Sequence, residues 1–474
     1  MTASNIVSTV DQARQDFQFS SSVAGLLKDV YIPELNNTTF YATPLMAMFN
    51  QFGGSFKFEG NKVIKGFKHQ GAGGFGAISE GGDFVKGRDQ KGFQGYERLK
   101  YLNAYFSLTG PAIETVMSGQ GSYVDAVASS MEDTLLLAKM NMERMCAGSG
   151  NGEIGRYANA ENSEVLTLEY IGTADGQSST TFSATTTLTA TAGGAYTKVQ
   201  WMQPGVRVNL VASGDFDGTI ATTDFVEAND GTRAIFELGH VDYAAGTFSL
   251  KNVSGQTVDA DEMDVETLVI VLENAYGAIE DPEGSTIDQS LELNGLYNLV
   301  DDGATYSKIW NLTRSTYPHA LKSSVVDANS QELDEDLLIS WILDLVNIKQ
   351  SVPDVLVTDP KSRLKYFGNR KEDRRFDTTV VKDYFGLESI GVQIDNYTLL
   401  VQSLSSLVPG TLFMLKTNDF MYTKATEGFK WLEGGTGVLR PFENKDGRFA
   451  TAVNYCNFVC ANPNGQLKVT DLAY

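Results

Sequence analysis

Residues 122–147 read SYVDAVASSMEDTLLLAKMNMERMCA, and no other stretch of the chain carries a clearer structural signal. A helix over these positions is about 39 Å long at 1.5 Å per residue, long enough to be the spine of a large domain. Ser122 and Asp125 resemble a capping box, and Gly148 is expected to supply the left-handed residue that ends the helix. The apolar residues recur at steps of three and four and so share one side: Val124, Val127, Met131, Leu135, Ala138, Met142 and Met145.

The segment before this helix is rich in glycine and in basic residues. Residues 57–100 hold eleven glycines, nine Lys or Arg and five Asp or Glu, although the whole chain has a net charge of −22. Apolar runs of β type occupy its two ends, at residues 56–67 and 96–108. We therefore expect a long β-hairpin with a positive net charge. Because such a ribbon cannot build a core of its own, its order should come from contact with another surface.

The texture of the sequence changes after the helix. Between about residues 161 and 273 it is rich in Ser and Thr, alternates between apolar and polar residues, and contains turn pairs such as Asp217-Gly218 and Asp230-Gly231. This region holds 4 basic and 17 acidic side chains, more than half of the negative excess of the chain. The pattern predicts an all-β inserted lobe, and its acidity favours an exposed position.

Helix and strand signals alternate from about residue 331 to 440, which predicts an α/β lobe. Val355-Leu356-Val357 predicts a short buried strand, after which Asp359 can cap a helix that begins at Pro360 and ends at Gly368. A further helix is expected before that strand, over residues 334–348. Its predicted buried side consists of Leu337, Leu338, Trp341, Ile342, Leu345 and Ile348.

The chain ends in two predicted strands, residues 448–460 and 467–472, joined by a turn at residues 463–465. The first of them contains Cys456 and Cys460. Together with Cys146 these are the three cysteines of the chain, an odd number that favours folding in a reducing compartment without disulfides. We expect all three to be buried, small apolar side chains.

The bulk properties exclude several classes of protein. At 474 residues two or three lobes are expected. The net charge of −22 argues against a dedicated nucleic-acid-binding role. The sequence shows no signal peptide and no run of 18 apolar residues, so we expect a protein that is neither secreted by that route nor membrane-spanning.

No arrangement of residues predicts catalysis, a metal ion or a cofactor. Residues 71–76 fit the G-x-G-x-x-G pattern of a dinucleotide site, but the following AISEGG cannot start the helix that such a site needs. His69, His240 and His319 lie far apart in the sequence. Residues 215–218 resemble part of a calcium loop without its remaining ligands, and weak calcium binding by the acidic lobe is left open.

The charged residues of the hairpin are the candidate functional residues. Its basic side chains could follow a nucleic-acid backbone or be simply solvated. We favour a third interpretation, charge complementarity with an acidic surface on a neighbouring copy, because the chain carries so large an acidic excess. The candidates are Lys57, Lys62, Lys65, Lys68, Glu80, Asp83, Lys86, Arg88 and Lys91.

The order of these elements resembles the Hong Kong 97-type major capsid protein of tailed phages and the related encapsulins. Residues 29–35 (DVYIPEL), leading into Thr43-Pro44-Leu45, look like that family's N-terminal arm, and Glu80-Gly81-Gly82-Asp83 in the hairpin looks like part of its E-loop. Residues 108–114 (LTGPAIE) before the predicted helix look like the entry into the P-domain spine, and residues 148–152 (GSGNG) close it in a familiar way.

The strand-Asp359-Pro360-helix unit resembles the A-domain of the family. The resemblance covers roughly residues 24–160 and 276–474, and the region between resembles the insertion domains of larger relatives. It implies an α+β fold of the Hong Kong 97 type with an inserted β-rich domain. The expected divisions are 1–54 N-terminal arm, 55–103 E-loop, 104–160 P-domain with spine helix, 161–273 insertion domain, 274–330 P-domain continuation, 331–440 A-domain and 441–474 C-terminal strands returning to the P-domain.

The function implied is that of a major capsid protein, not an enzyme, which self-assembles from hexamers and pentamers into an icosahedral shell around double-stranded phage DNA. The expected location is the virion, after assembly in the host cytoplasm. Scaffolding, portal and decoration proteins are left open as partners, and no sequence-specific nucleic-acid or membrane binding is expected. One alternative is the shell of an encapsulin-like cellular compartment. The other is a β-rich enzyme or glycan-binding surface protein whose site would lie in residues 161–273.

Overall fold

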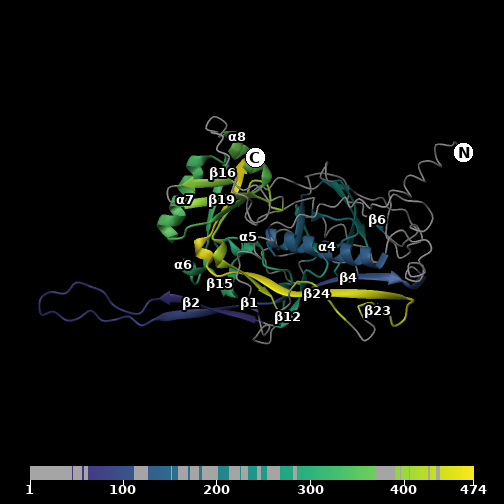
Figure 1. Cartoon of the computed structure of the whole chain (residues 1–474), viewed down its shortest axis with the longest axis horizontal. Coiled ribbons are helices and arrows are strands. Elements are labelled where there is room, and N and C mark those ends of the chain that lie inside the picture. The colour runs from purple at the N-terminus through teal and green to yellow at the C-terminus, as the bar shows by residue number, and fades with distance from the viewer. Residues whose placement is uncertain are drawn as a thin grey trace. The chain divides into compact units, whose positions relative to one another are not determined.

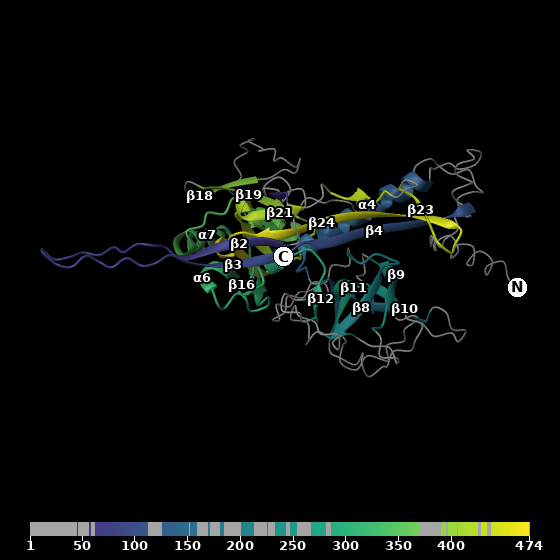
Figure 2. The ribbon, with the colours of Figure 1, turned by 90° about the horizontal axis from the view of Figure 1, so that it is seen from below.

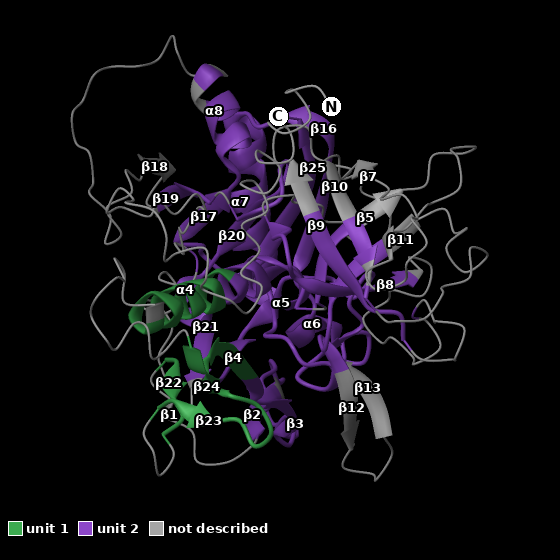
Figure 3. Cartoon of the chain, turned by 90° about the vertical axis from the view of Figure 1, so that its right-hand side faces the viewer, with its two compact units in different colours: residues 1–42, 102–140, 426–454 green, residues 43–101, 141–425, 455–474 purple. Residues whose placement is uncertain are grey.

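Figure 1 shows the computed structural model of the chain. The residues that it describes are 45, 56–57, 62–111, 126–150, 152–158, 169–170, 181–183, 201–212, 225, 233–242, 247–253, 267–280, 286–369, 390–394, 397–404, 406–424, 428–433 and 438–473. Helices and strands are mixed along the chain, which confirms the predicted α+β class. The chain forms two compact units, one of residues 1–42, 102–140 and 426–454, the other of residues 43–101, 141–425 and 455–474 (Figure 3).

The glycine-rich segment forms a hairpin as predicted, but its arms differ from the predicted runs 56–67 and 96–108, because residues 56–57 and 100–109 belong to another sheet. Strands β2 (Lys62–Gln70) and β3 (Lys91–Arg98) pair antiparallel from Lys62–Arg98 to Gln70–Lys91, and Figures 1 and 2 show them running out as a narrow ribbon. Beyond them only an isolated bridge between Gly73 and Arg88 continues the pairing among the described residues. Strand β4 (Lys100–Thr109) follows β3 after a single residue.

The spine helix is α4 (Ala126–Ala147), which ends where the sequence predicted; its predicted cap at Ser122 and Asp125 lies outside the described residues. The prediction for Gly148 is wrong. Its N–H donates to the carbonyl of Arg144 at 2.8 Å, as in a continuing helix, and its φ is not positive. The left-handed residues are Gly150 and Gly152, both at φ 77°, where a β-carbon would lie 2.3 Å and 2.4 Å from neighbouring atoms.

Seven strands between residues 153 and 272 form one sheet in the order β5-β11-β8-β9-β10-β6, with β7 on β10. Apolar side chains such as Val211, Phe225 and Val269 form a buried cluster in it. The β texture predicted for this region is confirmed, while its status as an inserted domain stays a prediction, because β5 precedes the predicted boundary. The strands are β5 (Glu153–Ala158), β6 (Glu169–Tyr170), β7 (Thr181–Ser183), β8 (Arg207–Ala212), β9 (Phe236–Asp242), β10 (Thr247–Asn252) and β11 (Thr267–Leu272).

A hairpin of β12 (Tyr276–Glu280) and β13 (Thr286–Ser290) follows. The α/β part of the chain comes next, and it is built on a six-stranded sheet with the order β16-β25-β20-β17-β19-β18. Helix α7 (Glu335–Lys349) packs on this sheet, and α8 (Pro360–Asn369) follows β17. The strands are β16 (Ser324–Glu332), β17 (Val355–Thr358), β18 (Ile390–Ile394), β19 (Tyr397–Ser403), β20 (Leu412–Leu415) and β25 (Leu467–Ala473).

The predicted helix starts are confirmed, whereas two details are wrong. The Asp359 carboxylate accepts hydrogen bonds from the N–H groups of Lys361 at 2.9 Å and Ser362 at 3.1 Å. Ile348 is 71% exposed, because in the last turn of α7 the core contact is made by Val346 instead. Gly368 lies within α8, where a β-carbon would meet nothing within 4 Å, so neither a turn nor a close contact requires glycine there.

The two C-terminal strands belong to different sheets, so the 3₁₀ turn at Pro463–Gly465 joins two sheets and does not close a hairpin. Strand β24 (Gly447–Cys460) pairs with β21 (Phe420–Lys424), which pairs in parallel with β1 (Phe56–Lys57). At its other end β24 pairs with β22 (Lys430–Trp431) and β23 (Arg440–Pro441). All three cysteines are buried and free, as predicted.

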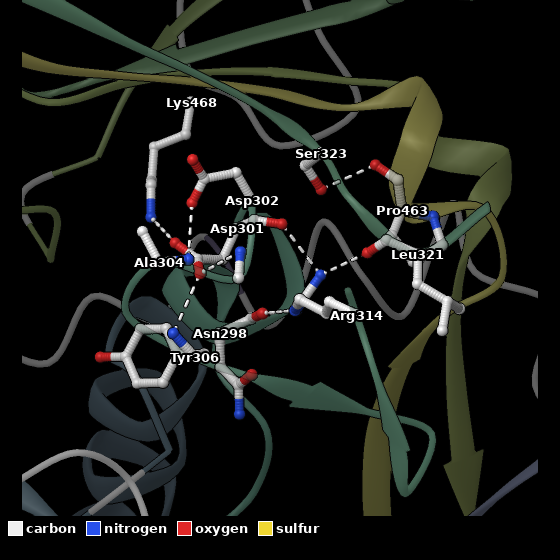
Figure 4. A network of polar contacts seen from close by, with 11 residues as sticks. Asn298, Asp301, Asp302, Ala304, Tyr306, Arg314, Leu321, Ser323, Pro463 and Lys468 are labelled. Carbon is white, nitrogen blue, oxygen red and sulfur yellow. Dashed lines mark hydrogen bonds and ion pairs between the residues drawn. The ribbon is translucent and has the colours of Figure 1, made fainter. Parts of the chain in front are cut away.

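A buried polar network ties β25 to the segment before β16 (Figure 4). The Lys468 ammonium lies 2.9 Å from the Asp301 carboxylate, and both side chains are almost fully buried. Burial alone would raise the pKa of Asp301, but Lys468 and the N–H groups of Tyr306 and Gly303 outweigh it and hold the pKa below its ordinary value. The carboxylate is therefore charged and fully engaged in the fold.

Arg314 completes the network with no exposed surface. It donates to the carbonyl oxygens of Asp301 at 2.9 Å and Leu321 at 2.6 Å, and to that of Asn298. Burial lowers its pKa to about 10, which still leaves the guanidinium charged near neutral pH. These bonds fix the chain on both sides of β14 (Lys308–Ile309) and β15 (Leu312–Thr313).

Replacing Lys468 by Met should lower the free energy of unfolding by about 3–5 kcal/mol near neutral pH, because Asp301 would keep a buried charge without its partner. The matched control is Lys365→Met, which removes the exposed pair with Glu332 and should cost less than about 1 kcal/mol. Urea unfolding followed by circular dichroism measures both. Equal losses of unfolding free energy in the two variants would contradict the claim that the buried pair stabilises the fold more than the exposed one.

The loss of unfolding free energy caused by Lys468→Met should also depend on pH. The folded pKa of Asp301 is lowered, so its contribution is present above the ordinary Asp pKa of about 3.9 and is lost as pH falls through the folded value. The gap between the Lys468→Met variant and the unmodified chain should therefore narrow only in acid.

Candidate assembly surface

The hairpin is anchored at its base by a turn whose residues lie far away in the sequence. Trp310 and Asn311 join β14 to β15, and both have φ 55°. Positive φ is costly for a residue as bulky as Trp, so the surrounding contacts must hold it in place. The Trp310 side chain is 1% exposed and its indole N–H donates to the carbonyl of Cys460 at 2.8 Å.

Strand β3 is bound to this turn by backbone and side chain. The Tyr96 N–H donates to the Trp310 carbonyl at 3.0 Å, and the Trp310 N–H donates to Glu97 Oε1 at 2.7 Å. Gly95 makes the close approach possible, because a β-carbon there would lie 2.6 Å from the Trp310 β-carbon. Three consecutive residues of β3 thus contact a single tryptophan.

Aromatic rings extend the anchor across both strands. The cross-strand pair Phe67 and Phe93 stacks at 5.1 Å between ring centroids, and Phe93 stacks in turn on Tyr317 at 3.8 Å. The Phe67 ring also meets Trp310 edge-on at 6.0 Å. Aromatic contacts of this kind add about 0.5–1.5 kcal/mol each beyond area burial, so the base of the hairpin is held firmly to its own chain.

Several candidate charges are used at this base. Lys65 donates to the Ala461 carbonyl at 2.6 Å, and its burial lowers the pKa of the ammonium. The Lys62 ammonium lies 4.7 Å from the centre of the Tyr96 ring, a cation–π contact. Lys57 lies outside the hairpin, in β1 opposite Lys424 of β21. Burial also raises the pKa of Glu97 and lowers that of Lys100.

The remaining candidates lie on or near the outer part of the hairpin and are exposed. They are Lys68, Glu80, Asp83, Lys86, Arg88 and Lys91, and no ion pair among the described residues involves them.

The most exposed apolar side chains of the described residues are found beside these charges. Phe75 is 101% exposed and Phe84 is 88% exposed, and Ile78 and Val85 are about half exposed. Two fully solvated phenylalanines on one short ribbon are an unsatisfied apolar surface. We call residues 71–90 the hairpin tip.

Sequence reasoning found the hairpin and its charges but not its anchor or its apolar tip. Trp310 and Tyr317 meet β3 across more than 200 positions, and no local pattern signals such a contact. Phe75 and Phe84 were visible as aromatic residues within a polar, glycine-rich stretch, and that composition is the signal that could have found them.

The structure gives no support to metal chemistry or a dinucleotide site in the hairpin. No group of three His, Cys, Asp or Glu side chains among the described residues is arranged to hold a metal ion. The GAGGFG stretch lies in the tip, and residues 77–90 contain no helix. In the described part of the chain, no helix has the length and apolar character needed to cross a membrane.

No protein-family model and no curated protein matches the chain, but solved structures do. A chain of the cyanophage A-1(L) capsid is 9% identical with a TM-score of 0.49, over 95% of this chain and 98% of that one. The chain is similar to shell proteins. The capsid of Myoviridae phage XM1 matches at 7% identity and a TM-score of 0.42, over 95% and 98% of the two chains.

The holo-SrpI encapsulin complex from Synechococcus elongatus PCC 7942 contains a further similar chain. It is 7% identical with a TM-score of 0.36, and 95% of each chain is covered. Capsid and encapsulin chains are the two classes that the sequence resemblance implied.

The Trp310 anchor can be tested with two glycine substitutions on adjacent rungs of the β2–β3 ladder. Gly95→Ala should lower the melting temperature, because the added methyl group must displace Trp310; overpacking of this kind costs about 1–3 kcal/mol. Gly66→Ala is the matched control in β2, where a β-carbon meets nothing within 4 Å. Differential scanning calorimetry measures both, and a Gly66→Ala effect as large as that of Gly95→Ala would contradict the proposed role of the close approach.

Proposed function

We propose that this chain is the major capsid protein of a tailed phage and that its hairpin packs on an adjacent copy in the shell. The observation that carries the proposal is the contrast within the hairpin. Its base is locked to its own chain by Trp310, Phe93 and Tyr317, whereas Phe75 and Phe84 at its tip are fully solvated. An arm that is held rigidly at one end and is apolar at the other is suited to burial in an assembly.

The energies support this interpretation. Burying one phenylalanine side chain contributes about 1.5–3 kcal/mol, so Phe75 and Phe84 together supply several kcal/mol for each contact between copies. Because the base is already ordered, little conformational entropy is lost when the tip docks. The exposed Lys68, Lys86 and Arg88 add charge complementarity on a protein whose net charge is −22.

In this proposal residues 55–103 are the E-loop, α4 is the P-domain spine and residues 331–440 form the A-domain. The shell is built from hexamers and pentamers, and scaffolding, portal and decoration proteins are its further partners. The protein assembles in the host cytoplasm, resides in the virion and performs no catalysis. Residues 161–273 would be the insertion domain, and their acidity favours the outer surface.

An encapsulin-like compartment is the second candidate, and the same hairpin would serve it equally. The two functions differ in what the shell encloses. Genes for a terminase and a portal protein beside this one would decide for the phage, and a gene for a cargo enzyme would decide for the compartment.

Removing the tip should abolish shells and leave a soluble, folded protein. Residues 74–87 can be replaced by Asn-Gly, because the backbone groups of Gly73 and Arg88 already bond to each other at 3.0 and 3.1 Å and a two-residue turn closes such a pair. Electron microscopy and sedimentation velocity compare this variant with the unmodified chain, each expressed alone and with the neighbouring phage genes.

The control is Leu364→Ser, which removes another exposed apolar side chain (74%), from α8. It should assemble normally. Normal shells from the tip-trimmed variant would contradict the role of the hairpin, and an unmodified chain that stays monomeric under both conditions would contradict the proposed function itself.

A further inference from the structure

Two ionisable residues of opposite charge lie at the junction between β3 and β4. Strand β3 ends at Arg98 and β4 begins at Lys100, and Leu99 between them is 5% exposed. Glu97 and Lys100 stand on the two sides of this junction, and we call them the junction pair. The pair and the residues that contact it belong to the same compact unit as the hairpin.

Glu97 is a contact through which β3 holds the Trp310 turn. Its Oε1 accepts the Trp310 N–H at 2.7 Å, and the Asn294 side chain donates to the same carboxyl group. The charged groups that face Glu97 are Lys100 and Arg314, both cationic. A change in the charge of this carboxyl group therefore acts directly on the attachment of β3.

Lys100 has few partners that can compensate its charge. A backbone carbonyl accepts from its ammonium, and the charged groups that face it are Glu97, Glu292 and Arg98. Glu292 is already engaged in a buried ion pair with Arg144, and Arg98 has the same charge as Lys100. Lys100 therefore depends mainly on Glu97 for its counter-charge.

Loss of hydration controls the protonation of the junction pair. It is the largest influence on both groups, raising the pKa of Glu97 and lowering that of Lys100, although each residue keeps some exposed surface. The opposite charges and the hydrogen bonds reduce these changes but do not cancel them. Both charged forms are therefore less favourable in the closed base of the hairpin than in water.

The resulting pH effect has a definite sign. When β3 leaves the Trp310 turn, Glu97 returns to water and to an ordinary pKa of about 4.3. The closed base binds the proton more readily than the open one, so it is favoured as pH falls toward about 4.3 and loses this contribution as pH rises through the closed-state pKa. Lys100 acts in the opposite direction, over a range of higher pH that ends near 10.4.

We propose that the junction pair is a proton-dependent clasp on the hairpin: with a proton on Glu97 strand β3 is held more firmly against the Trp310 turn, and with Glu97 ionised the base opens more often. The inference goes beyond the proposed function, because it concerns the single chain and holds whatever the shell encloses. Since the base sets the direction of the ribbon, the clasp makes the order of the hairpin depend on pH.

Hydrogen exchange of two backbone amides tests the clasp. The Tyr96 N–H donates to the Trp310 carbonyl and the Trp310 N–H donates to Glu97, so both amides exchange when the base opens. Mass spectrometry of the full-length chain measures their protection between about pH 5 and 8, corrected at each pH for the intrinsic exchange rate. We expect a loss of protection as pH rises.

Glu97→Gln keeps an acceptor for the Trp310 N–H but has no proton to lose. The pH dependence of the two amides should disappear in this variant. The matched control is Glu332→Gln, which neutralises an exposed carboxylate paired with Lys365 and should leave the pH dependence unchanged. Asp419, whose pKa is also raised by burial, is present in both variants and so cannot produce a difference between them.

A second variant keeps the test decisive if Glu97→Gln fails to fold. Glu97→Gln/Lys100→Met removes both charges at similar volume, so that no ammonium is left without its main counter-charge. Replacing both members of a buried ion pair is often neutral or stabilising, whereas removing one member is costly. Protection of the two amides in the double variant should likewise be independent of pH.

The outcomes separate this inference from the proposed function. Protection that rises with pH in the unmodified chain, or a pH dependence that persists in the Glu97 variants, would overturn the clasp. Neither result bears on the proposed function, which assembly of the tip-trimmed and unmodified chains tests. A chain that never assembles but shows the expected exchange would overturn the proposed function alone.

Discussion

The direction of the hairpin depends on one contact, the packing of β3 against Trp310. A two-stranded ribbon in water has no core and would otherwise sample many orientations. The turn at Trp310 removes this freedom by accepting the Tyr96 N–H, donating to Glu97 and leaving no room for a β-carbon at position 95. The contacts at the base therefore determine the direction in which the tip points.

The anchor is itself supported by buried charges. Arg314 and the Asp301–Lys468 pair hold the chain on both sides of the β14–β15 turn, and Glu97 accepts from its backbone. A buried charge is stable only where its partners are, because an uncompensated ion in the interior costs several kcal/mol. Any other packing of this region would leave Arg314, Asp301 or Lys468 buried without its partner. The network therefore favours a single geometry for Trp310.

The parts of the fold that could be predicted from sequence are those with a local cause. Side chains a few positions apart determine the spacing of apolar residues in α4 and the start of α8 at Asp359-Pro360. They also determine the alternation of buried and more exposed residues in β24. Ile348 and Gly368 were misjudged for local reasons, since Val346 makes the core contact in that turn and no contact requires glycine at 368. The error at Gly148 arose where distant residues decide the outcome. Gly148 looked like a helix terminator, but the chain first needs left-handed glycines at 150 and 152, where Leu293 and Ala275 approach the backbone.

The candidate site, too, could be predicted from sequence only in part. The charges of the hairpin were visible in the sequence, but their roles were not, because Lys65 is drawn to the Ala461 carbonyl by the folding of residues nearly 400 positions apart. The composition marks Phe75 and Phe84 as candidates, because both are aromatic residues in a polar, glycine-rich stretch. It does not show that they are exposed, since a phenylalanine in such a segment can also fold inward.

The net charge gives a physical reason why the proposed contact would need an apolar tip as well as a basic hairpin. Copies that each carry −22 repel one another as they approach, although at physiological salt this repulsion is screened beyond about 8 Å. In the proposed contact, residues 57–100, with nine basic and five acidic side chains, would reduce this repulsion. Screened charges contribute little net affinity at an exposed surface. The stable part of the contact must then come from apolar area removed from water, and in the hairpin that area lies at Phe75 and Phe84.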